Sequence, residues 1–145
     1  MLIQAATQYG VMVPNEPGEL AKVASTLAEI GINLDGITSV TVGASVHVKF
    51  LGEPAHDITP ALRAAGYSVC VTPVLRLWAQ AVPDFVHRVA QELAHAGISV
   101  TSFYGHTAKD GANYVLAVDK PREAAAALSR IHDLTAVDRR ETAAR

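Results

Sequence analysis

The stretch from Asn15 to Leu20 carries the residue types best suited to chemistry in this chain. Pro17 suits the first turn of a helix, where its missing N–H costs nothing. The start of a helix offers unpaired N–H groups and a partial positive charge, which attract a carboxylate. Gly18 has no Cβ, so a ligand could approach its backbone closely. The stretch could therefore bind a small carboxylate at the start of a helix.

Two asparagines, Asn15 and Asn33, could serve the same ligand, because an amide side chain both donates and accepts hydrogen bonds. Structural roles account for the same residues. Asn15 can stabilise the turn before the helix, and Gly18 can be present for its backbone geometry alone. Asn33 directly follows the cap of a helix and can have a structural role there. Asp35-Gly36 could form a kink or bulge in the next strand. Alternatively, Asp35 could contact the ammonium group of a ligand. Both interpretations stay open at this point.

Other reactive side chains lack the spacing that a metal site or an activated nucleophile requires. Of the six histidines, His87 and His95 share a helix face but lie about 12 Å apart along its axis, too far for one ion. Cys70 alternates with Val69 and Val71, as a packing residue in a strand does. The chain has no glycine-rich phosphate-binding loop. We therefore expect no metal, no cofactor and no enzymatic activity.

The composition excludes several further classes. The chain has 145 residues, 50% of them hydrophobic and 18% charged, which indicates a folded protein with a real core. The net charge is -2 and no run of Lys and Arg is present, so binding of nucleic acid is not expected. One cysteine excludes a disulfide framework. Without a signal peptide or a membrane-length apolar run, we expect a cytoplasmic protein.

The sequence matches itself at a shift of 66 residues, which places Pro17 on Pro83 and Gly31 on Gly97. After one inserted residue the shift becomes 67. We therefore predict two repeats, over 1–74 and 75–137, with a frayed tail over 138–145.

Apolar spacing and turn residues predict the same order of elements in both repeats: strand, helix, strand, strand, helix, strand. The expected strands cover 8–13, 32–42, 45–50, 67–75, 77–81, 98–106, 113–118 and, weakly, 134–137. Pro17 opens the first helix and Gly31 ends it; a second carries Ile58 and Leu62, and two more cover 85–96 and 122–131. This order predicts an α+β protein of two tandem ferredoxin-like βαββαβ repeats, with antiparallel sheets and helices on one face.

The residues Asn15, Pro17, Gly18 and Leu20, followed by Gly31-Ile32-Asn33, resemble the ACT domain. In that family an Asn/Asp-x-Pro-Gly-x-Leu loop opens the first helix, and Gly-Ile/Val-Asn follows it. The resemblance implies a non-catalytic regulatory module that binds an amino acid. In the branch that senses serine, two asparagines at these places hold the ligand, which implies a small polar amino acid here. The implied partners are this amino acid, a second copy in a homodimer and a regulated enzyme.

The second repeat departs from this pattern, because Ala81 stands for Asn15, Asp84 for Gly18 and Ser99 for Asn33. Asp84 is expected to cap its own helix and to repel a ligand carboxylate. The second repeat would then have no ligand site in its own loop and would supply only the opposing wall of a site in the first repeat. The expected ligand-binding residues are Asn15, Glu16, Pro17, Gly18, Glu19, Leu20, Asn33, Leu34, Asp35, Ser99 and Thr101.

Trp78 alternates with Leu77 and Ala79, so it is expected on the open face of its sheet, opposite the core. A large apolar side chain at that position favours a surface for a partner, although Trp78 could simply cover the edge of its own sheet. A ligand-free dimerisation module, or a module that binds an enzyme, is therefore the alternative function.

Overall fold

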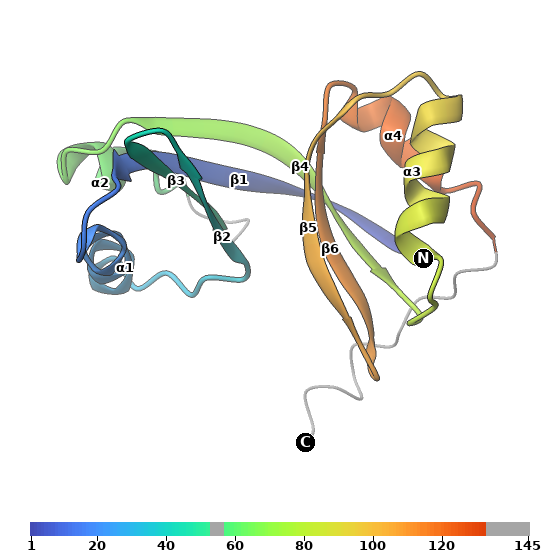
Figure 1. The fold of residues 1–145 in the computed structure, drawn as a ribbon, viewed down its shortest axis with the longest axis horizontal. Helices are drawn as coiled ribbons and strands as arrows, with labels where there is room; N and C mark the ends of the chain where they lie inside the picture. The colour runs from blue at the N-terminus through green and yellow to red at the C-terminus, as the bar shows by residue number, and fades with distance from the viewer. Residues whose placement is uncertain (53–56, 133–145) are drawn as a thin grey trace. The chain divides into compact units, whose positions relative to one another are not determined.

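The computed structural model describes residues 1–52 and 57–132 (Figure 1). The helices and strands within these residues follow the expected order, except that one strand, β4, stands where two were expected. In chain order they are β1 (Leu2–Pro14), α1 (Glu19–Glu29), β2 (Ile37–Val42), β3 (Ser45–Leu51), α2 (Thr59–Ala64), β4 (Val69–Ala79), α3 (Phe85–His95), β5 (Val100–Ala108), β6 (Gly111–Val118) and α4 (Pro121–Leu128). No helix among the described residues is long and apolar enough to cross a membrane.

The strands are hydrogen-bonded in the order β2-β3-β1-β4-β6-β5. The pairs β1–β3, β2–β3, β4–β6 and β5–β6 are antiparallel. This confirms the expected α+β class with an antiparallel sheet.

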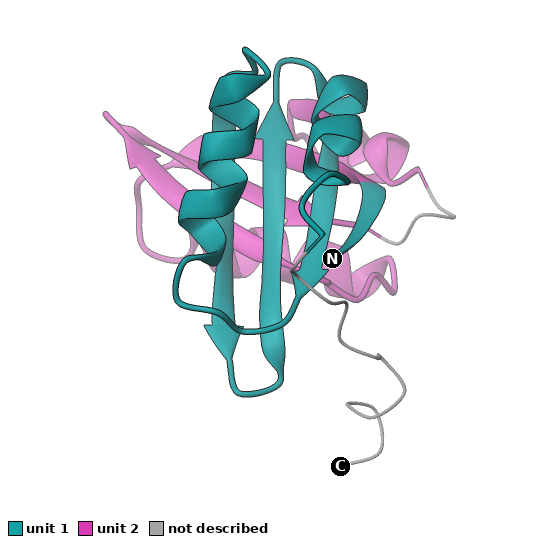
Figure 2. Cartoon of the chain, turned by 90° about the vertical axis from the view of Figure 1, so that its right-hand side faces the viewer, with its two compact units in different colours: residues 1–5, 73–145 teal, residues 6–72 magenta. Residues whose placement is uncertain are grey.

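The chain forms two compact units, coloured separately in Figure 2. Unit 1 contains Met1–Ala5 and the chain from Pro73 onward, and unit 2 contains Ala6–Thr72. The division falls inside β4, which is one continuous strand instead of the two expected over 67–75 and 77–81. β1 is divided as well, because its first residues belong to unit 1.

Each unit has its own apolar core between its helices and one face of its strands. In unit 2, Val23 and Leu27 of α1 pack against alternating strand residues such as Val48 and Phe50. In unit 1, the α3 stripe of Phe85, Val89 and Leu93 packs against β4, β6 and α4. Figure 2 shows the two helices of unit 1 (teal) on the same face of its strands.

The helix ends repeat the spacing seen in the sequence. α1 and α3 have the same length, 11 residues, and their bounds differ by 66 at both ends. Gly31 N–H donates to Ala28 O at 3.0 Å, and Gly97 N–H donates to Ala94 O at the same distance. Both glycines have positive φ, 72° and 66°. The predicted glycine stop of each helix is confirmed.

The starts of β1 and β2 differ most from the expected strand boundaries. β1 begins at Leu2 and not at residue 8, and Ile3 at its start packs against the core of unit 1. β2 begins at Ile37 and not at residue 32. The Ile32 N–H is bonded to Leu27 O at 3.1 Å, so this residue belongs to the end of α1 and cannot start a ladder. The strand expected over 134–137 and the tail 138–145 lie outside the described residues.

Trp78 does not form an exposed surface, contrary to the expectation. Its side chain is 8% exposed, and the Arg76 guanidinium carbon lies 4.4 Å from the centre of its ring. Arg76 itself is buried. The counterpart of Trp78 in unit 2, Met12, is 54% exposed.

Candidate functional site

The loop between β1 and α1 is exposed from Asn15 to Gly18, and it lies beside the β2–β3 turn. The Asn15 N–H donates to Ala44 O at 2.9 Å, and the Glu16 N–H donates to Pro14 O at the same distance. Pro17 precedes the helix instead of occupying its first turn, because Gly18 is the residue that caps α1. The backbone of Asn15 is therefore fixed, while its side chain is in an exposed position.

Gly18 has a left-handed conformation, with φ of 88°. A Cβ on it would meet no atom within 4 Å, so the space around this residue is open. The left-handed conformation alone favours glycine, which supports the backbone interpretation of this residue. The open space is also what the ligand interpretation requires. The backbone interpretation of Gly18 is therefore supported, and the ligand interpretation stays a prediction.

The first turn of α1 carries its own ion pair. Lys22 Nζ donates to Glu19 Oε1 at 2.6 Å, and this hydrogen bond and charge raise the pKa of the Lys22 side chain. The Glu19 N–H donates to Glu16 O over a long 3.4 Å, so it is only weakly engaged. Leu20 is 47% exposed beside this pair. The loop thus combines a weakly bonded N–H, a charged pair and an exposed apolar side chain.

Asn33, Leu34 and Asp35 lie at the other end of α1. α1 has 11 residues, which corresponds to about 16 Å of helix. The strand registers agree, because Val42 pairs with Ser45 near Asn15, whereas Ile37 pairs with Phe50 at the far end. Leu34 packs against the core of unit 2. One copy of unit 2 therefore does not bring Asn15 and Asn33 together.

The counterpart of Asn33 in unit 1 is bonded to the protein itself. The Ser99 N–H donates to Asp119 Oδ1 at 3.0 Å, and the Asp119 N–H donates to Ser99 O at 3.2 Å. Lys120 Nζ donates to Gly97 O at 3.1 Å in the same corner. Thr101 is exposed and lies where the β5–β6 register shifts, between Val100 and Ser102.

Asp84 does not cap α3 through its side chain, contrary to the expectation. Its φ and ψ are -96° and 11°, in the bridge region, whereas a capping side chain needs a more extended backbone. The carboxylate instead lies 3.8 Å from Arg88 Nε. The side-chain cap expected at the start of α3 is therefore absent, whereas the expected repulsion of a ligand carboxylate by Asp84 stays a prediction.

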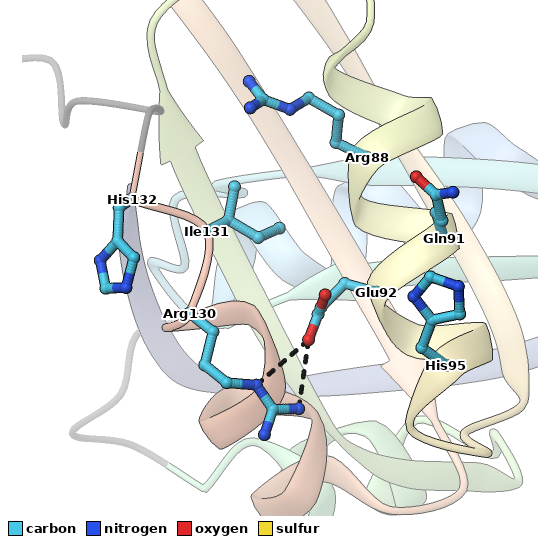
Figure 3. Close-up of a pocket in the computed structure, with 7 residues that line it drawn as sticks. All are labelled: Arg88, Gln91, Glu92, His95, Arg130, Ile131 and His132. Carbon is cyan, nitrogen blue, oxygen red and sulfur yellow. Dashed lines mark hydrogen bonds and ion pairs between the residues drawn. The ribbon is translucent and has the colours of Figure 1, made fainter.

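Unit 1 also has a polar hollow that was not expected from the sequence (Figure 3). It is lined by one face of α3 and by the residues that follow α4. Two of its lining residues, His95 and His132, were considered in the sequence as metal ligands, and their spacing from the other histidines argued against that role. No group of three or more potential ligands to a metal occurs within residues 1–52 and 57–132.

No protein-family model matches the sequence, and no curated protein matches it either. Solved structures do match. Protein BT0572 from Bacteroides thetaiotaomicron has a TM-score of 0.81 and 21% identity, over 93% of this chain and 94% of that chain. The ligand-free regulatory subunit of aspartate kinase from Thermus thermophilus has a TM-score of 0.67 and 18% identity, over 90% and 97%. E. coli aspartokinase III in complex with lysine and aspartate has a TM-score of 0.57 and 15% identity, over 90% and 32%.

At these identities the likeness concerns the fold. The chain shares its fold with regulatory subunits of aspartate kinase, which agrees with the fold that the resemblance of Asn15, Pro17, Gly18 and Leu20 implies. The chain spans nearly the full length of a regulatory subunit, but only about a third of the complete aspartokinase.

Proposed function

We propose that this chain is a non-catalytic regulatory protein of two tandem ACT-like repeats, one over 1–74 and the other over 75–137. A small polar amino acid binds at the β1–α1 loop of the first repeat. The protein acts in the cytoplasm as a homodimer, and the ligand changes its action on a regulated enzyme. The observation that carries this proposal is the open, left-handed Gly18 at the start of α1, in a fold shared with regulatory subunits.

The repeat proposal is supported by the backbone as well as by the sequence. α1 and α3, the hydrogen bonds that end them and their glycine stops all repeat at a spacing of 66. Unit 1 includes Met1–Ala5, so the N-terminal end of β1 serves the second repeat. Each repeat thus has the βαββ order and a fourth strand beside its first.

A second copy would complete the site. β2 is an edge strand of the sheet, and its Ile37, Val40 and Val42 side chains are 46%, 53% and 56% exposed. An exposed edge strand with apolar side chains favours pairing with another strand. If two β2 strands pair antiparallel about a twofold axis, the Asn15 end of one copy meets the Asn33 end of the other. The two asparagines would then face one ligand from different copies.

In this arrangement the loop provides the polar groups that a zwitterion needs. The Glu19 N–H and the Asn15 amide would hold the ligand carboxylate. Asn33 of the second copy would contact its polar end, with Asp35 near the ammonium group. Because the ligand touches both copies, it would stabilise one arrangement of the dimer, and that shift of population is the regulatory signal.

A thermal-shift screen of the twenty common amino acids tests this function. A ligand at a hundred times its Kd stabilises the protein by about 2.7 kcal/mol. Gly18→Val should abolish the shift. Gly97→Val is the matched control, because Gly97 also has positive φ and open space around its Cβ, but lies in unit 1. A ligand shift that survives in Gly18→Val would place the site elsewhere.

The alternative function, a ligand-free dimerisation or enzyme-binding module, is favoured by the exposed apolar edge of β2. It predicts that no amino acid shifts the melting temperature. It also predicts that Val40→Lys dissociates the dimer, as sedimentation would show, without any change in response to amino acids.

A further inference from the structure

We propose that Ile37 of the partner subunit closes the amino-acid site at the β1–α1 loop and limits the size of its ligand, because two β2 strands pair with Val40 on the twofold axis. The proposal rests on the ligand and the homodimer proposed above. It adds the register of the interface and a residue that determines specificity. The residues that carry it all belong to unit 2.

β2 is an edge of the sheet that is suited to pairing with another strand (Figure 1). It contains no charged residue and no proline, and its register with β3 is regular from Ile37 to Val42. Charged side chains, prolines and bulges are the features that normally keep an edge strand from pairing. β5, the opposite edge, has such an irregularity between Val100 and Ser102. Pairing through β2 alone gives a closed dimer, whereas two pairing edges would give an open chain of subunits.

The helix side of β2 is exposed. Ile37 and Ser39 pair with Phe50 and Val48, which are fully buried in the core of unit 2. Residues directly opposite each other share a face of the sheet, so Ile37, Ser39 and Thr41 lie on the same side as the helices. These three are nevertheless exposed, Ile37 by 46%. The helices therefore stop short of β2 and leave a ledge that is formed by Ile37, Ser39 and Thr41.

Two registers of a twofold pair are centred on this strand. Because opposite residues share a face, the axis passes through a residue, and the central residues of β2 are Ser39 and Val40. With Val40 on the axis, Val40 packs against its own copy and Val42 against Thr38 of the partner subunit. With Ser39 on the axis, Val42 meets Gly36 of the partner subunit instead. Val40 and Val42 are 53% and 56% exposed, and pairs of β-branched side chains stabilise a sheet, so the axis at Val40 is favoured.

This register places the partner's Ile37 opposite Gly43, in the turn between β2 and β3. A Cβ on Gly43 would meet no atom within 4 Å, so the turn leaves space for the larger side chain. The next residue, Ala44, accepts the hydrogen bond from the Asn15 N–H at 2.9 Å. The partner's Ile37 therefore lies beside the β1–α1 loop, on the helix side of the sheet.

The ligand then meets two different groups on the ledges of the two copies. Thr41 offers a hydroxyl group, which both donates and accepts hydrogen bonds. The partner's Ile37 offers a branched apolar side chain at the end of the site. The hydroxyl group suits a polar ligand, and the bulk of the isoleucine excludes a long one. The two groups together fit serine or threonine better than leucine or glutamine.

Disulfide crosslinking of the full chain tests the register in a Cys70→Ser background. Val40→Cys should oxidise readily to a covalent dimer, because this position faces its own copy across the axis. Ser39→Cys should crosslink more slowly, since its counterpart then lies on the diagonal, about 7–8 Å away. His106→Cys is the control for random collision, because it has the matching position on β5, 66 residues further along. Faster crosslinking through Ser39→Cys, or equal rates in the three variants, would overturn the register.

Thermal shifts of the full chain with serine, threonine, leucine and glutamine test the role of Ile37. The wild type should respond to serine or threonine. Ile37→Ala should still fold, because the side chain is 46% exposed, and should bind leucine about tenfold more tightly than the wild type does. Val71→Ala, 49% exposed on β4 of the same unit, is the matched control and should keep the preference of the wild type. An unchanged preference in Ile37→Ala would overturn the role of this residue.

The two experiments separate this proposal from the one on which it rests. Crosslinking through Val40→Cys without a thermal shift from any amino acid would support the register and contradict the ligand, and with it the role of Ile37. A thermal shift without crosslinking through Val40→Cys would support the ligand and overturn the register.

Discussion

Ser99 and Asp119 form two hydrogen bonds with each other just before β5, one to the Asp119 side chain and one between their backbones. The Ser99 N–H donates to the Asp119 carboxylate at 3.0 Å, and the Asp119 N–H donates back to the Ser99 carbonyl oxygen at 3.2 Å. Asn33, the equivalent of Ser99 in unit 2, makes no such bond to another described residue. A carboxylate of the protein therefore occupies in unit 1 the kind of position that a ligand could occupy in unit 2.

Asp119→Ala should destabilise unit 1 by about 1 kcal/mol, because it removes one charge-assisted hydrogen bond at an exposed position. Urea unfolding measures the change. Asp110→Ala, in the exposed β5–β6 turn, is the control and should have little effect. Equal stability of the wild type and Asp119→Ala would mean that the contact does not hold the start of β5.

Gly105→Ala should be far more damaging. A Cβ at Gly105 would lie 2.2 Å from Asn113 O and 2.6 Å from Tyr114 Cα, so β5 and β6 would have to separate. We expect a loss above about 3 kcal/mol, typical of severe overpacking against the backbone. Gly43→Ala is the control, since Gly43 has positive φ but nothing within 4 Å, and should cost only about 1 kcal/mol. Similar melting temperatures for the two variants would contradict this reading.

The elements that sequence predicted well are those with a local cause. α1 and α3 have apolar stripes and a glycine stop, and both ends of each helix fall within two residues of expectation. β3 alternates through Val46, Val48 and Phe50, and the structure has it one residue longer than predicted. Such patterns depend on the residues within one element, so no knowledge of the rest of the fold is needed.

The features that sequence missed depend on contacts between distant segments. The burial of Trp78 could not be read from alternation, which assigns a residue to a face but not what covers that face. The N-terminal extension of β1 is equally non-local, because residues 1–5 join a unit that begins again at Pro73. Asn15 and Asn33 belong to one sequence motif, but they lie at opposite ends of α1. Their separation depends on the length of α1 and on the register of β2, which the motif does not reveal.

The pH dependence of stability should include a contribution from Asp57. The Thr59 N–H donates to Asp57 Oδ1 at 3.0 Å, and this bond to the start of α2 lowers the pKa of the Asp57 carboxyl. The folded state then favours the ionised form. The resulting stabilisation is fully present above about pH 4, near the ordinary pKa of an Asp side chain. It is lost as the pH falls through the lowered pKa of Asp57.

Asp57→Asn removes this titration while keeping an acceptor oxygen. The free energy of unfolding, measured in urea between neutral and acidic pH, should fall less steeply with acid in Asp57→Asn than in the wild type. Asp110→Asn is the control for loss of an exposed carboxylate. Parallel pH profiles for the wild type and Asp57→Asn would contradict the role given to this bond.

Ile3 tests whether the N-terminal end of β1 belongs to unit 1. Its partly buried side chain packs against the core formed by α3, α4, β4 and β6. Ile3→Ala should lower the free energy of unfolding by about 1–2 kcal/mol, less than the cost at a fully buried position. Gln4→Ala, the exposed neighbour on the same strand, is the control.

Because local openings reflect the unit in which contacts are lost, amide exchange in Ile3→Ala should accelerate at Leu116 of unit 1 more than at Val48 of unit 2. Faster exchange at Val48 alone would assign the start of β1 to the other unit.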